Sequence, residues 1–332
     1  MNVREMTEKF EEQFLSPYAQ LSSRSKGRKR EEEKCEIRTD FQRDRDRIIH
    51  SKSFRRLKHK TQVFISPEGD HYRTRLTHTL EVAQIARTIA RGLRLNEDLT
   101  EAIALGHDLG HTPFGHAGEY VLNQICPHGF KHYEQSLRVV DYLEDGKGIN
   151  LTWEVRDGIL NHTGDNMAET LEGQIIKYAD RIAYINHDID DAIRGKVISS
   201  DSIPAECIRI LGDTHSKRIN TMITDIIRQS ADKPGISMSE EILNATLELR
   251  NFMFENVYIG SAAKNEEQKA QNIVAELYYF FTKHPENMPE QYSMMLDKED
   301  TDRIVCDYIA GMTDRYAVNK FYEIFIPESW RK

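Results

Sequence analysis

The sequence predicts an all-α, mainly helical fold with one small β-hairpin near residues 61–72. Glycine and proline number only 18 and 9 among 332 residues, which is below their average usage. Leu, Ile, Ala, Glu, Lys and Arg recur at helical spacing over most of the chain. The run Val63-Phe64-Ile65, followed by the turn signals Ser66-Pro67, is the one good strand candidate. With 39% hydrophobic and 30% charged residues, the composition supplies a sizeable core and disfavours intrinsic disorder.

In chain order, we expect an arm or peripheral helix over residues 1–35 and a helix over residues 40–58. The helix predicted for residues 76–93 has the wide apolar stripe of a buried helix. The helix of residues 97–109 begins after the cap-like Asn96 and has Gly110 as its stop signal. Further helices are predicted at residues 119–126, 134–143, 153–161, 171–193, 204–229, 239–258, 266–284 and 298–317. Small and polar residues mark a weak boundary at 194–203.

Charge-free stretches and cysteine spacing indicate the cellular setting. The longest stretches without a charged residue have 11 residues, whereas a bilayer-spanning helix needs about 20 apolar residues. The N-terminus lacks the apolar region of a secretory signal. The four cysteines form no CxxC pair, so neither a disulfide framework nor a thiolate zinc site is indicated. We therefore expect a cytoplasmic protein with reduced thiols and no membrane contact.

The net charge of −9 hides an uneven distribution. Residues 24–75 contain 17 Lys and Arg against 9 Asp and Glu, a net of +8, which leaves −17 for the rest of the chain. For residues 24–34, the simple interpretation is a solvated helix or flexible arm. Later cations such as Arg75 lie among apolar residues, as expected for a folded anion site.

Histidines and carboxylates predict a metal site. Nine of the 13 histidines fall between His50 and His132, and imidazole is the usual side chain for metal binding and proton transfer near neutral pH. His107-Asp108 is the strongest local signal, with His78 one helix earlier. In a later helix Asp180 and Asp188 share one face but lie about 12 Å apart along its axis. Only one of them can bind the same ion, and spacing alone leaves both as candidates beside a merely solvated acidic face.

The order of these residues resembles the H…HD…D signature of the HD superfamily of metal-dependent phosphohydrolases. The surrounding residues resemble more closely its deoxynucleoside triphosphate triphosphohydrolases, the dGTPase-like proteins. The resemblance covers residues 40–260. It rests on Phe54-Arg55-Arg56-Leu57 with Gln62, Thr74-Arg75-Leu76-Thr77-His78, His107-Asp108-Leu109-Gly110-His111-Thr112-Pro113-Phe114-Gly115-His116 and Ala179-Asp180-Arg181-Ile182-Ala183-Tyr184.

The resemblance implies a division of labour among the site residues. It selects Asp180 over Asp188 as the fourth metal ligand. The implied ligands of a divalent ion (Mn, Mg, Fe, Co, Ni or Zn, which the sequence does not distinguish) are His78, His107, Asp108 and Asp180. The implied substrate-binding residues are Gln62, Arg75, Arg181, Tyr184, Asp188, Arg250 and Tyr258.

Proton transfer is expected from a histidine close to a carboxylate. His116 and Glu119 lie three residues apart, so on one helical turn the carboxylate can orient the imidazole and raise its basicity. The resemblance also implies that this pair is catalytic and that His111 lies close to the α-phosphate. His132 resembles a further active-site histidine over a shorter match, and we rank it below His116 as the proton-transfer residue.

The predicted reaction is metal-dependent hydrolysis of dGTP or several dNTPs to deoxynucleoside and inorganic triphosphate. An HD core over residues 36–200 would follow the arm of residues 1–35, and residues 201–332 would form a helical region that completes the substrate site and an oligomer interface. One alternative is another HD-type enzyme, namely a nucleotidase, a cyclic-nucleotide phosphodiesterase or an alarmone hydrolase. The other is a nucleic-acid-binding protein with a structural metal. Expected partners are dNTPs, further copies of the chain and, weakly, single-stranded nucleic acid.

Overall fold

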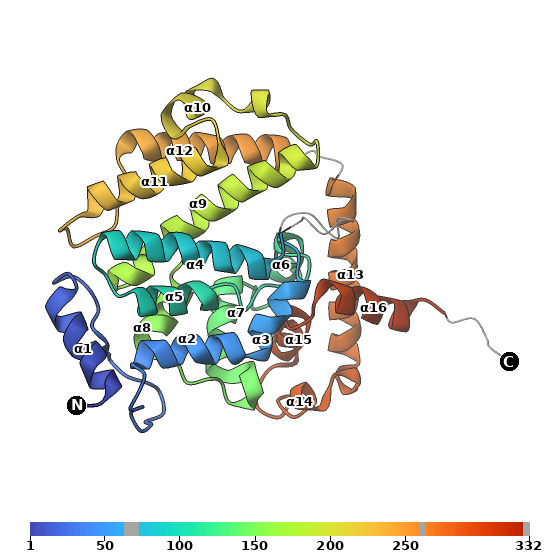
Figure 1. The fold of residues 1–332 in the computed structure, drawn as a ribbon. Coiled ribbons are helices and arrows are strands. Elements are labelled where there is room, and N and C mark those ends of the chain that lie inside the picture. The colour runs from blue at the N-terminus through green and yellow to red at the C-terminus, as the bar shows by residue number, and fades with distance from the viewer. Residues whose placement is uncertain (63–72, 259–262, 328–332) are drawn as a thin grey trace. The chain divides into compact units, whose positions relative to one another are not determined.

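The computed structural model describes residues 1–62, 73–258 and 263–327, and this part of the chain is mainly helical with no sheet (Figure 1). The predicted all-α class is therefore confirmed. Thr61 and Thr74 form an isolated antiparallel bridge. The predicted hairpin falls on residues that lie largely outside the described ones. Within the described ranges, no helix has the length and apolarity that crossing a membrane requires.

The chain divides into two compact units, each assembled from several segments. The first unit comprises Met1–Ser51, Thr77–His107 and Ile149–Ser261. Its elements are α1 (Val3–Phe14), η1 (Ser22–Arg24), α2 (Asp40–His50), most of α4 (Arg75–Gly92), α5 (Glu97–Gly106), α8 (Trp153–Leu160), α9 (Leu171–Arg194), η5 (Ser200–Ser202), α10 (Ala205–Leu211), α11 (His215–Ser230), α12 (Glu240–Met253) and the π-turn η6 (Phe254–Tyr258).

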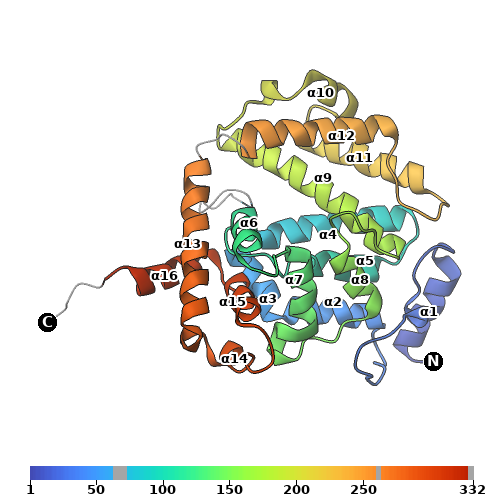
Figure 2. The ribbon, with the colours of Figure 1, turned by 180° about the vertical axis from the view of Figure 1, so that it is seen from behind.

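Helix α5 lies at the centre of the first unit and packs against α2, α8 and α9. It starts where the Asn96 side chain accepts a hydrogen bond from Leu99 N, as the sequence predicted. Almost all its later residues are buried, and a Cβ on Gly106 would lie 2.6 Å from Ile159 Cδ1. Helices α11 and α12 pack on α9, and α10 packs on both of them (Figures 1 and 2). This packing fixes the end of α5, where His107 follows.

The second unit comprises Lys52–Leu76, Asp108–Gly148 and Ala262–Lys332. Its elements are α3 (Lys52–Arg56), η2 (Leu57–His59), α6 (His116–Ile125), α7 (His132–Arg138), the π-turn η3 (Val139–Leu143), η4 (Glu144–Gly146), α13 (Ala263–Lys283), η7 (Pro285–Asn287), α14 (Glu290–Ser293), α15 (Thr301–Ala310) and α16 (Asp314–Phe325). Helix α13 packs against α6, α15 and α16. Its Tyr278 and Phe281 are buried in an apolar core with Tyr308.

Three predicted helices are each broken in the structure. The helix expected over residues 40–58 stops at Ser51, whose extended backbone (ψ 153°) separates α2 from α3. The helix expected over residues 204–229 is interrupted at Gly212, whose φ of 113° an L-residue rarely adopts. The helix expected over residues 298–317 breaks at 311–313, where Thr313 caps α16. Apolar periodicity continues across these breaks, so spacing alone did not reveal them.

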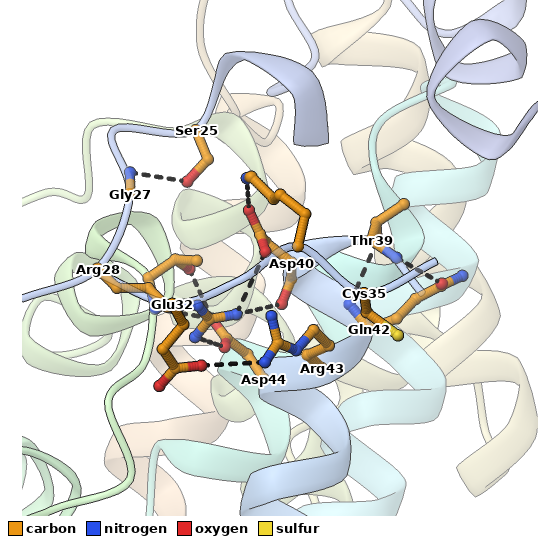
Figure 3. A network of polar contacts seen from close by, with 12 residues as sticks. Ser25, Gly27, Arg28, Glu32, Cys35, Thr39, Asp40, Gln42, Arg43 and Asp44 are labelled. Atoms are coloured by element: carbon orange, nitrogen blue, oxygen red, sulfur yellow. Dashed lines mark hydrogen bonds and ion pairs between the residues drawn. The ribbon is translucent and has the colours of Figure 1, made fainter. Parts of the chain in front are cut away.

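Most side chains of the basic segment of residues 24–34 are exposed, as the simple interpretation predicts, but the segment forms no α-helix and Arg28 is an exception to the exposure. Arg28 is only 6% exposed and forms an ion pair with the fully buried Asp44. Its guanidinium also donates to the carbonyl oxygens of Asn150 (2.6 Å) and Asp40 (3.0 Å). Glu32 pairs with Arg43 at 3.0 Å in the same network (Figure 3). A buried cation needs such partners, so this segment is built into the first unit.

Candidate active site

The first group of site residues belongs to the first unit and consists of two histidines and an aspartate. His78 lies in the first turn of α4, His107 directly follows α5, and Asp180 lies in the middle of α9. His78 Nε2 is 3.0 Å and His107 Nε2 is 3.9 Å from the same atom, Asp180 Oδ1. The long apolar face of α9 sets this position, because Ala179 and Ile182 on either side are fully buried.

A backbone contact determines which nitrogen of His107 can bind a metal. His107 Nδ1 is 2.6 Å from the carbonyl oxygen of Ala104. A carbonyl oxygen only accepts, so the proton lies on Nδ1 and the lone pair of Nε2 faces Asp180. Metal-binding histidines are commonly held in this way by a hydrogen bond from the other ring nitrogen.

The ligand set fits a divalent cation. Asp108 is bonded directly to His107, so its carboxylate is a further candidate ligand beside those of His78, His107 and Asp180. Two imidazole nitrogens and two carboxylates form a mixed nitrogen and oxygen set that several divalent metals accept, and fewer than six protein ligands leave positions for substrate oxygens. The residues present therefore fit the group that the sequence predicts.

The second group of site residues belongs to the second unit and begins with Arg75. Its side chain is buried, and Nη1 donates to Asp108 Oδ2 at 2.8 Å. Nε and Nη2 have no hydrogen-bond partner within the described part of the chain. A guanidinium with two unused buried N–H groups is suited to an anion that offers several oxygens.

Next to Arg75 lies a chain of histidines. His111 Nε2 is 3.4 Å from Asp108 Oδ1, and the His111 ring stacks on that of His132 with centroids 4.1 Å apart. His132 Nδ1 is 3.0 Å from both carboxylate oxygens of Glu119, while His116 Nδ1 is 3.6 Å from Glu119 Oε2. Both histidines thus meet one carboxylate, and the His132 contact is the shorter, although the sequence ranked His116 first.

Burial and neighbouring charges determine the protonation states of His111 and Glu119. Burial, together with the charges of Arg75 and His132, holds the pKa of His111 well below its ordinary value, so His111 stays neutral near pH 7. For Glu119, burial alone favours the neutral acid, but the His116 and His132 imidazoles outweigh it and hold its pKa well below the usual range. Glu119 is therefore an ionised carboxylate, which can accept a hydrogen bond from an N–H group of His132 or His116.

The loop from Gly110 to Gly115 depends on two close approaches of its backbone to other parts of the second unit. A Cβ on Gly110 would lie 2.1 Å from Ser136 N, so only glycine lets the loop meet the first turns of α7, which carries His132. Gly115 has a φ of 56°, and a Cβ there would lie 2.8 Å from Arg75 Nη2. The sequence fragment from His107 to His116 therefore contains glycines where its backbone must touch other parts of the site.

The remaining predicted substrate residues occupy separate places. Tyr184 and Asp188 lie one and two turns after Asp180 on α9, and Asp188 is buried. Tyr184 accepts a hydrogen bond from Arg250 Nε of α12 at 3.0 Å, and burial raises its pKa above the ordinary value. Arg181 is half-buried on α9, and Gln62 is half-buried at the end of the first described range. Tyr258 is the last residue of η6.

Three residues near these groups had no role in the sequence-based prediction. The ring of the buried His162 packs edge-on against His107 with centroids 5.0 Å apart, and its Nδ1 contacts the carbonyl oxygen of Ile159 at 2.7 Å. Lys60 and Asp314 contact the loop that carries His111. The sequence signal for His162 and Lys60 is weak, since His162 follows a helix end and Lys60 lies within a basic run.

Many cations of the basic segment are already paired with carboxylates, which limits its attraction for polyanions. Several lysines and arginines over residues 26–52 form ion pairs with carboxylates, namely Lys26 with Glu169, Arg28 with Asp44, Lys34 with Asp40, Arg38 with Asp46, Arg43 and Arg47 with Glu32, Arg45 with Asp98, and Lys52 with Asp145. Much of the local positive charge is thus neutralised within the protein. We infer that nucleic acid is a poor candidate for the main ligand.

Comparison with known proteins shows the family to which the chain belongs. Residues 75–185 match the HD domain family, and residues 236–323 match the phosphohydrolase-associated domain family. A deoxyguanosinetriphosphate triphosphohydrolase-like protein of Caldanaerobacter subterraneus subsp. tengcongensis is 65% identical over 99% of this chain and 98% of its own length. The chain belongs to the family of deoxyguanosinetriphosphate triphosphohydrolase-like proteins. A second member, from Desulfatibacillum aliphaticivorans, is 51% identical over 98% of this chain and 99% of its own.

A solved structure extends the family likeness to the fold. A phosphohydrolase from Bacteroides thetaiotaomicron VPI-5482 has a TM-score of 0.50 and 15% identity, and the match covers 84% of this chain and 69% of that one. At this identity the likeness concerns the fold alone. Family membership and the HD domain identify the chain as a phosphohydrolase of the dGTPase-like kind, with a cluster suited to a metal ion.

Proposed function

We propose that this protein hydrolyses deoxynucleoside triphosphates to deoxynucleoside and inorganic triphosphate with the help of a divalent metal ion. The observation that carries the proposal is the direct link of Asp108 to two kinds of partner. Asp108 follows the proposed metal ligand His107 and accepts a hydrogen bond from Arg75 at 2.8 Å, while His111 Nε2 lies 3.4 Å from Asp108 Oδ1. A cation site, an anion-binding arginine and a neutral imidazole therefore share one carboxylate.

His78, His107, Asp108 and Asp180 would hold the ion. When bound, a divalent ion polarises a phosphate oxygen and supplies an activated water. The proposal of Asp180 over Asp188 is supported by the 3.0 Å and 3.9 Å distances from His78 and His107 to Asp180 Oδ1. Which of Mn, Mg, Fe, Co, Ni or Zn serves is a matter for metal analysis of the purified protein.

Arginines would neutralise the triphosphate. The unused Nε and Nη2 of Arg75 are suited to the phosphate nearest the metal, and Arg181 and Arg250 to the others. In the reaction, a water oxygen forms a bond to the α-phosphorus and the bond from that phosphorus to the 5′ oxygen breaks. Negative charge grows on phosphate oxygens during this step, so fixed cations stabilise the transition state more than the ground state.

Two proton transfers accompany the formation and cleavage of these bonds. The attacking water loses a proton, and the departing 5′ oxygen gains one. His111, neutral and buried, would donate a hydrogen bond to an oxygen of the α-phosphate. The pair of Glu119 with His132 or His116 would relay the proton, since the carboxylate of Glu119 can orient an adjacent imidazole for proton transfer. The shorter contact favours His132 as the inner partner and the more exposed His116 as the outer one.

Four of the predicted residues would contact the nucleoside part of the substrate. Gln62 is proposed to lie near the sugar or base, Tyr184 and Asp188 to face the nucleoside, and Tyr258 to pack on the deoxyribose. The name of the relatives supports dGTP as one substrate, whereas acceptance of several dNTPs remains part of the proposal. We further propose an arm over residues 1–35, an HD core over 36–200 and a C-terminal region over 201–332 that forms contacts between copies of the chain.

Product analysis tests this function against other HD-type activities. Purified protein is incubated with each dNTP, singly and in pairs, with Mg²⁺ or Mn²⁺, and the products are separated by anion exchange. Deoxynucleoside and triphosphate in equal amounts are expected. Monophosphate with pyrophosphate, or turnover only of a monophosphate, a cyclic nucleotide or an alarmone, would refute the proposal. Single-strand binding is checked separately by its salt dependence.

A further inference from the structure

Lys60 is a buried lysine that the proposed chemistry does not use. Its side chain is 2% exposed, and Nζ donates to the carbonyl oxygens of His111 (2.5 Å) and Ala310 (2.7 Å). Burial of an ammonium group is costly unless hydrogen bonds compensate it. The two acceptors are backbone carbonyls, so the side chain ties two chain segments that lie 199 residues apart.

Asp314 makes a matching connection at the other end of the same loop. This carboxylate is 5% exposed and lies in the first turn of α16. Oδ1 accepts from Phe114 N at 2.9 Å, and Oδ2 accepts from Thr61 N (2.9 Å) and Thr61 Oγ1 (2.7 Å). Lys60 and Thr61 are consecutive residues, and both contact the α15–α16 junction. Through these contacts Lys60 holds the His111 carbonyl and Asp314 holds the Phe114 amide.

The loop needs such support because its backbone is strained. Phe114 has a φ of 60° and Gly115 a φ of 56°. For a bulky residue this conformation is energetically unfavourable, and it persists only where surrounding contacts fix it. The Phe114 amide is fixed by Asp314, and the next residue, Gly115, is the one whose Cα lies against Arg75.

We propose that Lys60 and Asp314 are positioning residues that hold the loop of residues 111–115, and thereby the His111 ring and the Arg75 guanidinium, in the geometry of hydrolysis. This inference rests on the function proposed above. It assigns to the α15–α16 junction, residues 310–314, a part in the active site that the motif residues alone do not contain. Displacement of a catalytic group by about 1 Å can lower a rate by about 100-fold.

The test compares Lys60→Met with Lys52→Met. Methionine keeps much of the length of lysine and removes the three donors, whereas Lys52 is exposed and its ammonium pairs with Asp145 at the surface. We expect Lys60→Met to lower kcat by about 10- to 100-fold with KM changed less than about threefold, and Lys52→Met to change neither. Amide hydrogen exchange in a peptide covering residues 109–118 should accelerate in Lys60→Met alone.

A second pair of variants applies if Lys60→Met does not fold. Asp314→Asn places an amide against the donors of Phe114 and Thr61, and the exposed Asp297→Asn is its control. The same loss of kcat and the same faster exchange are expected for Asp314→Asn alone. Where all variants fold, the double variant Lys60→Met/Asp314→Asn should have a kcat little lower than that of the more impaired single variant, because both changes act on one loop.

Two outcomes separate this inference from the proposed function. If the unmodified protein turns over no dNTP, the proposed function fails, and hydrogen exchange still decides whether Lys60 and Asp314 hold the loop. If dNTP turnover is present but Lys60→Met and Asp314→Asn keep the kcat and the loop exchange rate of their controls, the positioning role is wrong.

Discussion

Two regions of this protein bury several charged groups, and they do so in opposite ways. In the N-terminal network, Arg28 is matched by Asp44 and Glu32 by Arg43 (Figure 3). Arg47 is a second partner of Glu32. In the candidate active site, buried donors exceed their protein partners, since Arg75 Nε and Nη2 find none within the described residues. Complete pairing indicates a structural role, and unused buried donors indicate a ligand.

The largest expected effect concerns the acid that holds the ion. Asp180→Asn should lower kcat/KM by about 1000-fold or more, because the amide is a weaker ligand, while the fold is retained. Asp188→Asn should keep the metal and chiefly raise KM for the nucleotide. Metal content by mass spectrometry and initial rates distinguish them, and Asp190→Asn on the same helix, whose side chain pairs with Arg194 at the surface, is the control. Equal metal loss in Asp180→Asn and Asp188→Asn would contradict the assignment.

The N-terminal network should respond in stability and leave catalysis unchanged. Asp44→Asn leaves the buried Arg28 without its closest counter-charge, so the free energy of unfolding should fall by about 3 kcal/mol. Asp46→Asn, at the half-exposed pair with Arg38, should lower it by less than about 1 kcal/mol. Urea unfolding measures both. A large fall in the turnover of folded Asp44→Asn molecules would break the contrast between the two regions.

The glycine beside Arg75 offers an intermediate effect. Gly115→Ala combines a φ of 56° with a Cβ 2.8 Å from Arg75 Nη2. It should lower kcat/KM by roughly 30-fold. Gly146→Ala has a similar φ of 71° but open space around the added Cβ, so it should destabilise the protein slightly and leave the rate unchanged. Steady-state kinetics of both variants test whether the contact or the backbone strain matters.

The smallest effect is a pH dependence in the N-terminal network. Partial burial favours neutral Glu32, but hydrogen bonds from Arg47 and Asn150 outweigh it and lower the pKa to about 2. Because this pKa lies below the ordinary value, the stabilisation is present above about pH 4.5 and is lost as the pH falls toward 2. Glu32→Gln should therefore cost about 1 kcal/mol at pH 7 and almost nothing near pH 2. Unfolding curves that stay separated at low pH would contradict the pairing.

Local sequence patterns predicted much of the fold and of the candidate site. Helical spacing and the Asn96 cap located α5, and the histidine and aspartate order pointed to His78, His107 and Asp108. Backbone breaks at Ser51 and Gly212 were missed because apolar periodicity continues across them. The contacts of Lys60 and Asp314 were missed because residues 60, 111 and 314 are far apart in the chain and meet only through the packing of the second unit. The pairing of Arg28 with Asp44 likewise depends on tertiary structure.

The position of bond cleavage tests the central claim most directly. Turnover of a dNTP is carried out in water enriched in ¹⁸O, and the products are analysed by mass spectrometry. Attack at the α-phosphorus predicts one ¹⁸O atom in each triphosphate and none in the deoxynucleoside. Label in orthophosphate, in pyrophosphate or in the deoxynucleoside would place the cleavage at another bond and contradict the proposed arrangement around Asp108, Arg75 and His111.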